Sequence, residues 1–331
     1  MDKRIIHAVA GSGKTRFIIE SLDLNTRTAI ITYTITNQME LKNRIIAKFG
    51  EIPNNIHVFG LFQFLYSFCL RPYYCEKKLK GINFKTDDIR NRFDNFKGNY
   101  IYSNKISKVL LDNSTDYIDR VSNFFDVVYI DEFQDLTAYD FEFALSLIEC
   151  STEIVYLGDF YQKTYSSSRV GNKGARIHRD FEEWKEKLSV FEWDDSTLSK
   201  SVRCPTQVCD FIREKLGINI SGTKSPQIEI KELIEHNDIA TVLEDDDIKK
   251  LFYQKFYEYP CSSKNWGDSK GSEYESICVV LNPTTYDKFR KNKLDSLTPQ
   301  TLSKFYVACT RTKGNLYFVE EKKVKKYYGM L

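Results

Sequence analysis

The segment HAVAGSGKTRF, from His7 to Phe17, constrains the fold of this chain more than any other stretch. The apolar run RIIHA at 4–8 reads as a strand that leads into it, and a helix-like run follows it. AVAGSGKT has the spacing of a phosphate-binding loop of the Walker A type, with Ala8 in the place usually held by the first glycine. A loop that joins a strand to a helix N-terminus in this way predicts an α/β nucleotide-binding core.

The residue types of this loop assign chemistry to individual positions. Glycines let backbone N–H groups approach phosphate oxygens, and the helix N-terminus adds its dipole. The residues expected to bind a nucleotide here are Ala10, Gly11, Ser12, Gly13, Lys14 and Thr15. Of these, Lys14 would reach the β- and γ-phosphates and Thr15 would hold Mg²⁺. The predicted cofactors are therefore Mg²⁺ and ATP, with other nucleoside triphosphates as alternatives.

A second motif, VVYIDEFQD at 127–135, ends an apolar run with two carboxylates. This is the form of a Walker B strand. Asp131 would hold Mg²⁺ through water, and Glu132 would orient or deprotonate the attacking water. A solvated acidic turn is the alternative, and the buried strand before it together with the phosphate loop argues against that alternative.

Short apolar runs alternate with helix-like stretches along the chain. The runs that read as buried strands are RIIHA (4–8), AIITYT (29–34), VVYID (127–131), IVYLGD (154–159), ICVVL (277–281) and LYFVE (316–320). Such runs predict parallel sheets of the α/β class. Helical spacing of apolar residues predicts helices at 39–49 and 205–216. Residues 71–115 are polar, basic and aromatic with no clear strand, and 218–262 contain the strand-like runs QIEIKEL and IATVL.

Length and composition exclude several classes of protein. The 331 residues suffice for two domains with their own cores. A net charge of +2 means that a nucleic-acid site must be a local patch. The eight cysteines form no C-x-x-C pair and lie near no histidine at ligand spacing, so no zinc or iron–sulfur centre is expected. No apolar run has the length of a membrane span, and we expect no signal peptide, no membrane partner and a reducing, cytoplasmic location.

The motif DEFQD (131–135) resembles the signature of superfamily 1 helicases of the UvrD/Rep type. Other segments resemble the remaining motifs of this family, in the family's order. They are ITYTITNQMELKNRI (31–45, motif Ia), HVFGLFQFL (57–65, Ib), YLGDFYQKTY (156–165, III), LSKSVRCP (198–205, IV), SKGSEYESICVVL (269–281, V) and YVACTRTKGNLYFV (306–319, VI). A lone Gly-Lys-Thr is weak support, whereas seven blocks in a fixed order from about residue 4 to 320 are specific.

The resemblance implies two RecA-like P-loop NTPase domains with parallel sheets and ATP between them. Domain 1A would span 1–200, with a small 1B-like insertion at about 71–115. Domain 2A would span 201–331, with a rudimentary insertion at about 218–262. Family members are usually about twice as long, so this chain would be a compact member that lacks the large insertions. Strand separation is therefore less firmly implied than translocation driven by ATP hydrolysis.

The family's pattern also implies roles for residues in the later motifs. Gln162 would contact the γ-phosphate and report its presence to the nucleic-acid side. Arg203 and Arg311 would act as arginine fingers, with surface ion pairs as the alternative. Glu273 is similar to the residue that holds the ribose hydroxyl, and Gly271 would allow a close backbone approach.

Contacts to a single strand are implied at four positions, namely Thr34, Asn37, Phe59 and Tyr165. This chain has fewer of the family's strand-binding aromatic residues, because Ile35, Gly60 and Ser167 stand where the family often has Phe, His and Trp. Loss of these base-stacking side chains should weaken binding of the strand or shift its binding to other residues. Core packing is an equally supported alternative for Phe59.

The adenine pocket departs from the family as well. Arg16 matches a residue that borders the base, but Val202 stands where a stacking tyrosine is usual. A glutamine-bearing segment that reads adenine normally lies upstream of the phosphate loop and is expected to be missing. These departures predict weak discrimination between ATP and GTP.

Two functions remain open at this point. The first is an NTP-dependent helicase or translocase on single-stranded DNA or RNA, for which the resemblance implies 3′ to 5′ movement. The second is a nucleic-acid-stimulated NTPase that does not unwind alone and serves a nuclease, replication or defence partner. The retained motif residues argue against a silent interaction module, and DEFQD argues against a P-loop kinase. Compact size would suit a viral, phage or defence-system protein.

Overall fold

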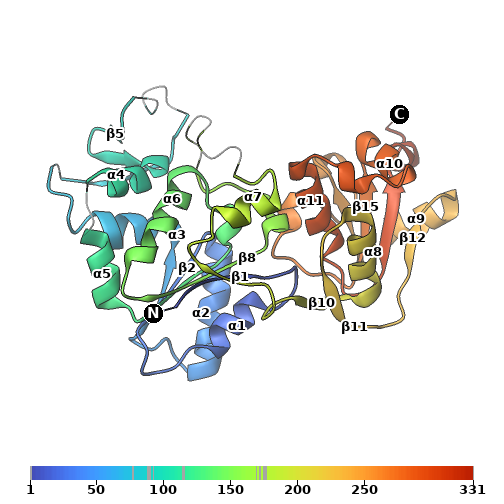
Figure 1. The fold of residues 1–331 in the computed structure, drawn as a ribbon. Coiled ribbons are helices and arrows are strands. Elements are labelled where there is room, and N and C mark those ends of the chain that lie inside the picture. The colour runs from blue at the N-terminus through green and yellow to red at the C-terminus, as the bar shows by residue number, and fades with distance from the viewer. Residues whose placement is uncertain are drawn as a thin grey trace. The chain divides into compact units, whose positions relative to one another are not determined.

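The computed structural model describes residues 2–76, 78–87, 91, 93–113, 116–168, 170, 173 and 177–330. The chain divides into two compact units (Figure 1). The first comprises Met1–His7, Lys14–Gly158 and Tyr165–Thr197, and the second comprises Ala8–Gly13, Asp159–Thr164 and Leu198–Leu331. Most of the phosphate loop and residues 159–164 of motif III therefore group with the C-terminal part of the chain.

The first unit is built on a six-stranded sheet with the order β3-β2-β7-β8-β1-β9, in which all neighbouring strands pair in parallel. Its strands are β1 (Lys3–His7), β2 (Thr28–Thr32), β3 (Ile56–Gly60), β7 (Val127–Ile130), β8 (Glu153–Gly158) and β9 (Glu192–Asp194). Every residue of β2 is buried, as expected of a central parallel strand. The strand predictions at 4–8, 29–34, 127–131 and 154–159 are confirmed to within two residues at each end.

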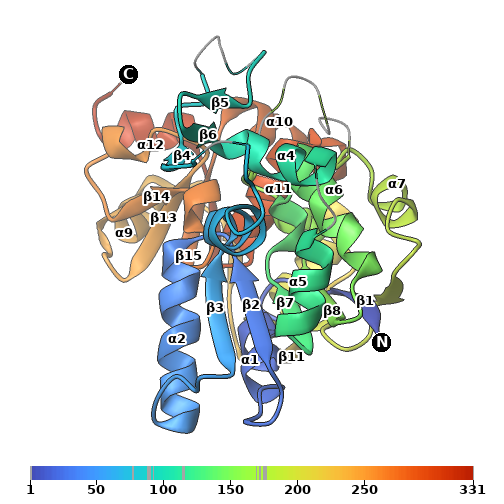
Figure 2. The same cartoon turned by 90° about the vertical axis from the view of Figure 1, so that its left-hand side faces the viewer.

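The helices of the first unit are α1 (Lys14–Glu20), α2 (Ile35–Phe49), α3 (Leu61–Gln63, continued by a π-helix at Phe64–Leu70), α4 (Ile106–Asn113), α5 (Asp116–Phe124), α6 (Ala138–Ser146) and α7 (Phe181–Glu186). Figure 2 shows α2 beside β3. Helix α2 begins at the N-cap Thr34 and ends at Gly50, which adopts a left-handed conformation with φ 86°. The helix predicted at 39–49 is confirmed within it.

The segment 71–115, predicted as an insertion without a clear strand, differs from that prediction in its secondary structure. It contains β4 (Gly81–Asn83), β5 (Phe96–Lys97) and β6 (Tyr100–Tyr102), which form a separate sheet with the order β4-β6-β5. These strands have only two or three residues. Their sequence therefore carries too little apolar alternation to be recognised.

The second unit is built on a five-stranded parallel sheet with the order β12-β16-β15-β13-β14. The strands are β12 (Ile230–Glu232), β13 (Ile248–Phe252), β14 (Ser263–Asn265), β15 (Ser276–Leu281) and β16 (Leu316–Glu320). A short parallel pair, β10 (Lys200–Pro205) and β11 (Ser221–Lys224), forms a further sheet. Alternate residues of β15 pack into two apolar clusters, so both faces of the sheet are covered. The strands predicted at 277–281 and 316–320 are confirmed.

The helices of the second unit are α8 (Thr206–Leu216), α9 (His236–Glu244), α10 (Pro283–Arg290), α11 (Pro299–Cys309) and α12 (Glu321–Tyr327). Helix α8 confirms the prediction at 205–216 and lies beside β10 and β11 (Figure 1). Residues 218–262 were expected to form a rudimentary insertion, but they contribute β12 and β13 to the main sheet. The strand-like run IATVL was misread, since it lies in α9 with Ile239, Val242 and Leu243 buried at helical spacing.

Candidate nucleotide and nucleic-acid sites

The phosphate loop connects β1 to α1, as the sequence predicts. Gly11 and Gly13 adopt φ values of 71° and 94°, which lie in the left-handed region that favours glycine. Ser12 is 9% exposed, and its buried hydroxyl oxygen has no hydrogen-bond partner in the described part of the chain. A buried hydroxyl without a partner is costly. The loop therefore fits a nucleotide phosphate, which would supply the missing acceptor.

The acidic motif at the end of β7 lies next to the loop lysine within the first unit. The Lys14 ammonium, on the first residue of α1, is 3.8 Å from the Glu132 carboxylate. Glu132 itself adopts a left-handed conformation with φ 55°, which is uncommon outside glycine. The side-chain amide of Gln134 donates to its other carboxylate oxygen at 2.5 Å. Asp131 is 8% exposed and is fixed by its backbone N–H, which donates to the Ile31 carbonyl at 2.9 Å.

A buried carboxylate that the sequence analysis missed organises the segment after motif III. Asp140, in α6, is 1% exposed and accepts hydrogen bonds from Ser107 at 2.6 Å and from Ser167 at 2.7 Å. Burial raises the pKa of Asp140 above its ordinary value, and the serine hydrogen bonds oppose that rise. The backbone N–H of Ser167 also donates to the Asp135 carbonyl at 2.9 Å. Asp140 thus ties α4 and the segment that carries Tyr165 to α6, the helix that follows DEFQD (131–135).

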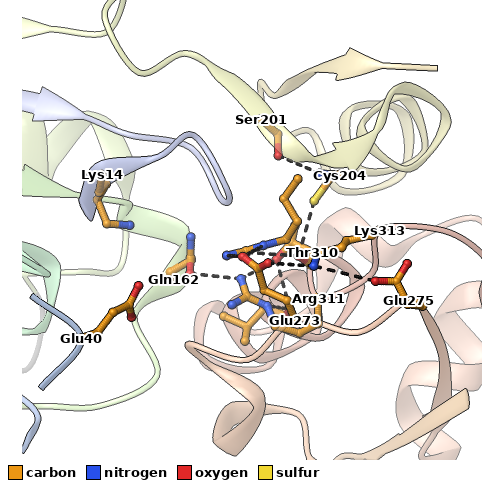
Figure 3. Close-up of polar contacts among 12 residues, drawn as sticks. Lys14, Glu40, Gln162, Ser201, Cys204, Glu273, Glu275, Thr310, Arg311 and Lys313 are labelled. Carbon is orange, nitrogen blue, oxygen red and sulfur yellow. Dashed lines mark hydrogen bonds and ion pairs between the residues drawn. The ribbon is translucent and has the colours of Figure 1, made fainter. Parts of the chain in front are cut away.

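A chain of buried hydrogen bonds runs from the phosphate loop to an arginine within the second unit. The Ala10 N–H donates to the Tyr306 hydroxyl at 3.1 Å, and that hydroxyl donates to the Asp159 carboxylate at 3.0 Å. The Gln162 amide donates to the same carboxylate oxygen at 2.9 Å. Its carbonyl oxygen accepts from the Arg311 guanidinium at 3.3 Å (Figure 3). We call these five residues the relay.

Arg311 is the cation of the relay and is 1% exposed. It follows α11, whose last turn holds the guanidinium: Arg311 Nε donates to the Val307 carbonyl at 2.9 Å and Nη2 to the Thr310 hydroxyl at 3.0 Å. Burial of Tyr306 beside Asp159 raises the pKa of the tyrosine well above its ordinary value, so its hydroxyl stays protonated. The sequence analysis identified Gln162 and Arg311 but missed the two residues that join them to the loop.

The second predicted arginine, Arg203, forms an ion pair with Glu273 at 2.7 Å, and Lys313 approaches the same carboxylate at 3.3 Å (Figure 3 shows Glu273 and Lys313). Partial burial raises the pKa of Glu273, but the charges and hydrogen bonds of Arg203 and Lys313 together outweigh it, so the pKa lies below its ordinary value. Gly11 packs against this arginine, since a Cβ at Gly11 would lie 2.6 Å from the Arg203 Cβ. Gly271 has φ 83° and open space around its Cα.

The predicted strand-binding residues occupy different environments in the first unit. Thr34 is exposed at the start of α2, where its hydroxyl accepts from the Asn37 N–H at 3.1 Å. Tyr165 is 43% exposed. Phe59 packs against the rings of His57, Phe64, Phe68 and Phe125. Those contacts favour the core-packing role that the sequence left open for Phe59.

Arg16 forms an ion pair within its own helix. It is exposed on α1 and pairs with Glu20 at 2.7 Å. Thr15 follows Lys14 on the same helix, so the hydroxyl predicted to hold Mg²⁺ belongs to the residue next to the loop lysine. The described residues include no group of three or more His, Cys, Asp or Glu side chains placed to hold a metal. None of the helices described is long and apolar enough to cross a bilayer.

Comparison with known proteins gives matches at the level of structure only. No protein-family model matches the chain, and no curated protein sequence does. An arterivirus nonstructural protein 10 (helicase) in complex with DNA matches with a TM-score of 0.53 and 12% identity, over 98% of this chain and 63% of that one. A second arterivirus nonstructural protein 10 (helicase) gives a TM-score of 0.52 and 12% identity, over 98% and 61%. A PRRSV helicase gives a TM-score of 0.50 and 13% identity, over 96% and 52%.

At these identities the likeness establishes the fold. The predicted class, α/β with RecA-like domains and parallel sheets, is confirmed, and the structural neighbours are viral helicases. This chain spans between about half and two thirds of the length of those structures.

Proposed function

We propose that this protein is an NTP-driven motor on single-stranded nucleic acid, a helicase or translocase of superfamily 1 and the UvrD/Rep type. The observation that carries the proposal is the relay, which joins the phosphate loop to a buried arginine through residues of motifs III and VI. A motor needs its arginine fixed with respect to the phosphates.

The proposed division of labour follows the chemistry of each group. Backbone N–H groups of Ala10 to Gly13 and the Lys14 ammonium bind phosphate oxygens. Thr15 and Asp131 hold Mg²⁺, which neutralises charge on the phosphates. Glu132 orients the attacking water, and the Gln134 amide, which donates to the Glu132 carboxylate at 2.5 Å, holds that carboxylate in place.

The arginines take the developing charge of the transferred phosphoryl group. Arg311 is already oriented by α11 and by Gln162, so little reorganisation is needed. Arg203 is paired with Glu273. The nucleotide competes with this ion pair, because its phosphate would bind Arg203 and its ribose hydroxyl would bind Glu273. Loss of the γ-phosphate changes the hydrogen-bond partners of Gln162. The segment that follows Gln162 leads to Tyr165, one of the proposed strand-binding residues.

The experiment that tests this proposal is displacement of streptavidin from oligonucleotides biotinylated at one end. With ATP and Mg²⁺, the protein is expected to displace streptavidin from the 5′ end faster than from the 3′ end, as 3′ to 5′ movement requires. Lys14→Ala provides the matched control and should displace neither. Equal, ATP-independent rates at both ends would contradict the motor proposal.

A nucleic-acid-stimulated NTPase that does not unwind alone is the second candidate. It is favoured by the small size of the insertion sheet, whose three strands have only two or three residues each. Streptavidin displacement without unwinding of a tailed duplex would select this candidate, and a nuclease or replication factor would then be the partner to seek.

Weak discrimination between nucleotides is part of the proposal. Arg16 pairs with Glu20 on the exposed side of α1, and Val202 is 44% exposed with no ring to stack on a base. We expect kcat/KM for ATP and GTP to agree within about tenfold, which corresponds to about 1.4 kcal/mol. A larger preference for ATP, measured by phosphate release, would show a base-reading contact that these residues do not supply.

A further inference from the structure

Three aromatic rings form a row in the first unit that leads from motif Ia into the insertion. Tyr33, which follows β2, lies 6.1 Å from Phe62 of α3, measured between ring centroids. Phe62 in turn lies 5.4 Å from Phe84, which follows β4, with the rings nearly perpendicular at 83°. We call Tyr33, Phe62 and Phe84 the ring row. Tyr33 is directly followed by Thr34, one of the predicted strand-binding residues.

The outer end of the ring row is open to solvent. Phe84 is 62% exposed, while Tyr33 and Phe62 are only partly buried. Ile35, beyond Thr34, is 75% exposed. A single exposed apolar side chain is ordinary. Here, however, the exposed ring packs edge-to-face with a second ring, which favours one orientation and leaves most of Phe84 open to solvent.

The charge around the ring row suits a polyanion. Lys80 and Lys85 are exposed and flank β4 on either side, and Lys85 directly follows Phe84. Neither lysine pairs with a carboxylate in the described part of the chain. Cations that track phosphates beside an exposed aromatic face are the two components of a sequence-tolerant site for single strands.

We propose that Phe84 is a base-stacking platform for single-stranded nucleic acid and that it extends the strand-binding surface from Thr34 into the insertion. The proposal rests on the proposed function. It also accounts for the aromatic residues that motif Ia and motif III lack, at Ile35 and Ser167, because the platform is supplied by the insertion instead. The ring row fixes this platform with respect to β2 through contacts that lie entirely within the first unit.

The test is binding of a fluorescent 20-nucleotide single strand, as DNA and as RNA, measured by anisotropy without nucleotide. Stacking of one base is worth about 1–3 kcal/mol, so Phe84→Ala should weaken binding roughly 5- to 150-fold. Phe84→Trp should restore binding because it keeps an aromatic face, whereas Phe84→Leu should not. The melting temperature of each variant reports whether it folds.

Phe93 offers a matched control. It lies in the same insertion, is 86% exposed and contacts no other ring in the described residues. Phe93→Ala should change the affinity less than twofold. Equal weakening by Phe93→Ala, or full binding by Phe84→Leu, would overturn the platform proposal.

The outcomes separate this inference from the proposed function. If the wild-type protein binds neither polymer, the motor proposal fails, and the platform proposal fails with it. If the wild-type protein binds and Phe84→Ala binds equally well, only the platform proposal fails.

Discussion

The acidic site of the first unit and the arginine site of the second are held in place by different means. Glu132 has a left-handed backbone, and its carboxylate lies 3.8 Å from the Lys14 ammonium and accepts from the Gln134 amide at 2.5 Å. Arg311 is instead held by side-chain and carbonyl contacts of 2.9–3.3 Å in a fully buried setting. We therefore expect substitution of Glu132 to lower the rate of hydrolysis with little change in stability, and substitution of Arg311 to lower both. Substitutions can test that difference directly.

Replacement of Arg311 should have the largest effect. An arginine on a transferring phosphoryl group is worth roughly 10³–10⁵ in rate, so Arg311→Lys should lower kcat for NTP hydrolysis by that order. It should also lower the melting temperature, because one ammonium cannot reproduce the buried hydrogen bonds that the guanidinium donates to Gln162, Val307 and Thr310. Arg290→Lys is the matched control, since Arg290 forms an exposed ion pair with Glu232 in the same unit. Near-normal hydrolysis by Arg311→Lys would assign the arginine to structure alone.

Replacement of Glu132 should separate rate from stability. Glu132→Gln is expected to lower kcat by about 10²–10⁴, as for loss of a general base, with an unchanged free energy of unfolding. Glu132→Gly should be equally slow yet more stable by roughly 1 kcal/mol, because glycine relieves the left-handed strain. Hydrolysis assays and urea unfolding provide the two readouts. Marked destabilisation by Glu132→Gln would remove the contrast between the two sites.

The relay should respond to loss of one hydroxyl. Tyr306→Phe leaves the buried Ala10 N–H without its acceptor, which should cost about 1–3 kcal/mol in the free energy of unfolding. The KM for nucleotide should rise, since the loop loses a support. Tyr257→Phe, at a residue 73% exposed, should change neither quantity. Unchanged stability in Tyr306→Phe would mean that the relay is not coupled to folding.

The Arg203–Glu273 pair should give the smallest effect. Because it is partly exposed, Glu273→Gln should cost less than about 1 kcal/mol at pH 7. The pKa of Glu273 is lowered in the folded state, so the contribution of the pair is present above the unfolded pKa and is lost as the pH falls through the folded value. The stability difference between the wild type and Glu273→Gln should therefore vanish in acid. A difference that persists after the carboxylate is protonated would contradict this assignment.

The sheets were predictable where strands are buried on both faces. Runs such as 277–281 are continuously apolar because helices cover each side of the sheet. Strand β13 was not recognised, since its sequence IKKLF places two lysines in a strand of the main sheet. Lys250 is fully buried there, and the sequence pattern does not predict that a lysine will be buried.

The site was predictable where a motif fixes it locally. The loop glycines and the acids after β7 are each contiguous in sequence, and their chemistry follows from their spacing. The relay was not predictable in full, since Tyr306 and Asp159 are 147 residues apart and only the fold joins them. Asp140 was not predicted, because an acidic residue inside the apolar helix AYDFEFALS does not indicate which residues will donate hydrogen bonds to it. Its donors are two serine hydroxyls from other segments of the chain.

The most direct test of the motor proposal is the rate of NTP hydrolysis by the purified protein as single-stranded DNA or RNA is added. The rate is predicted to rise to a plateau with at least one polymer, and Lys14→Ala should be inactive throughout. A wild-type rate that stays flat with both polymers would contradict a motor driven by strand binding.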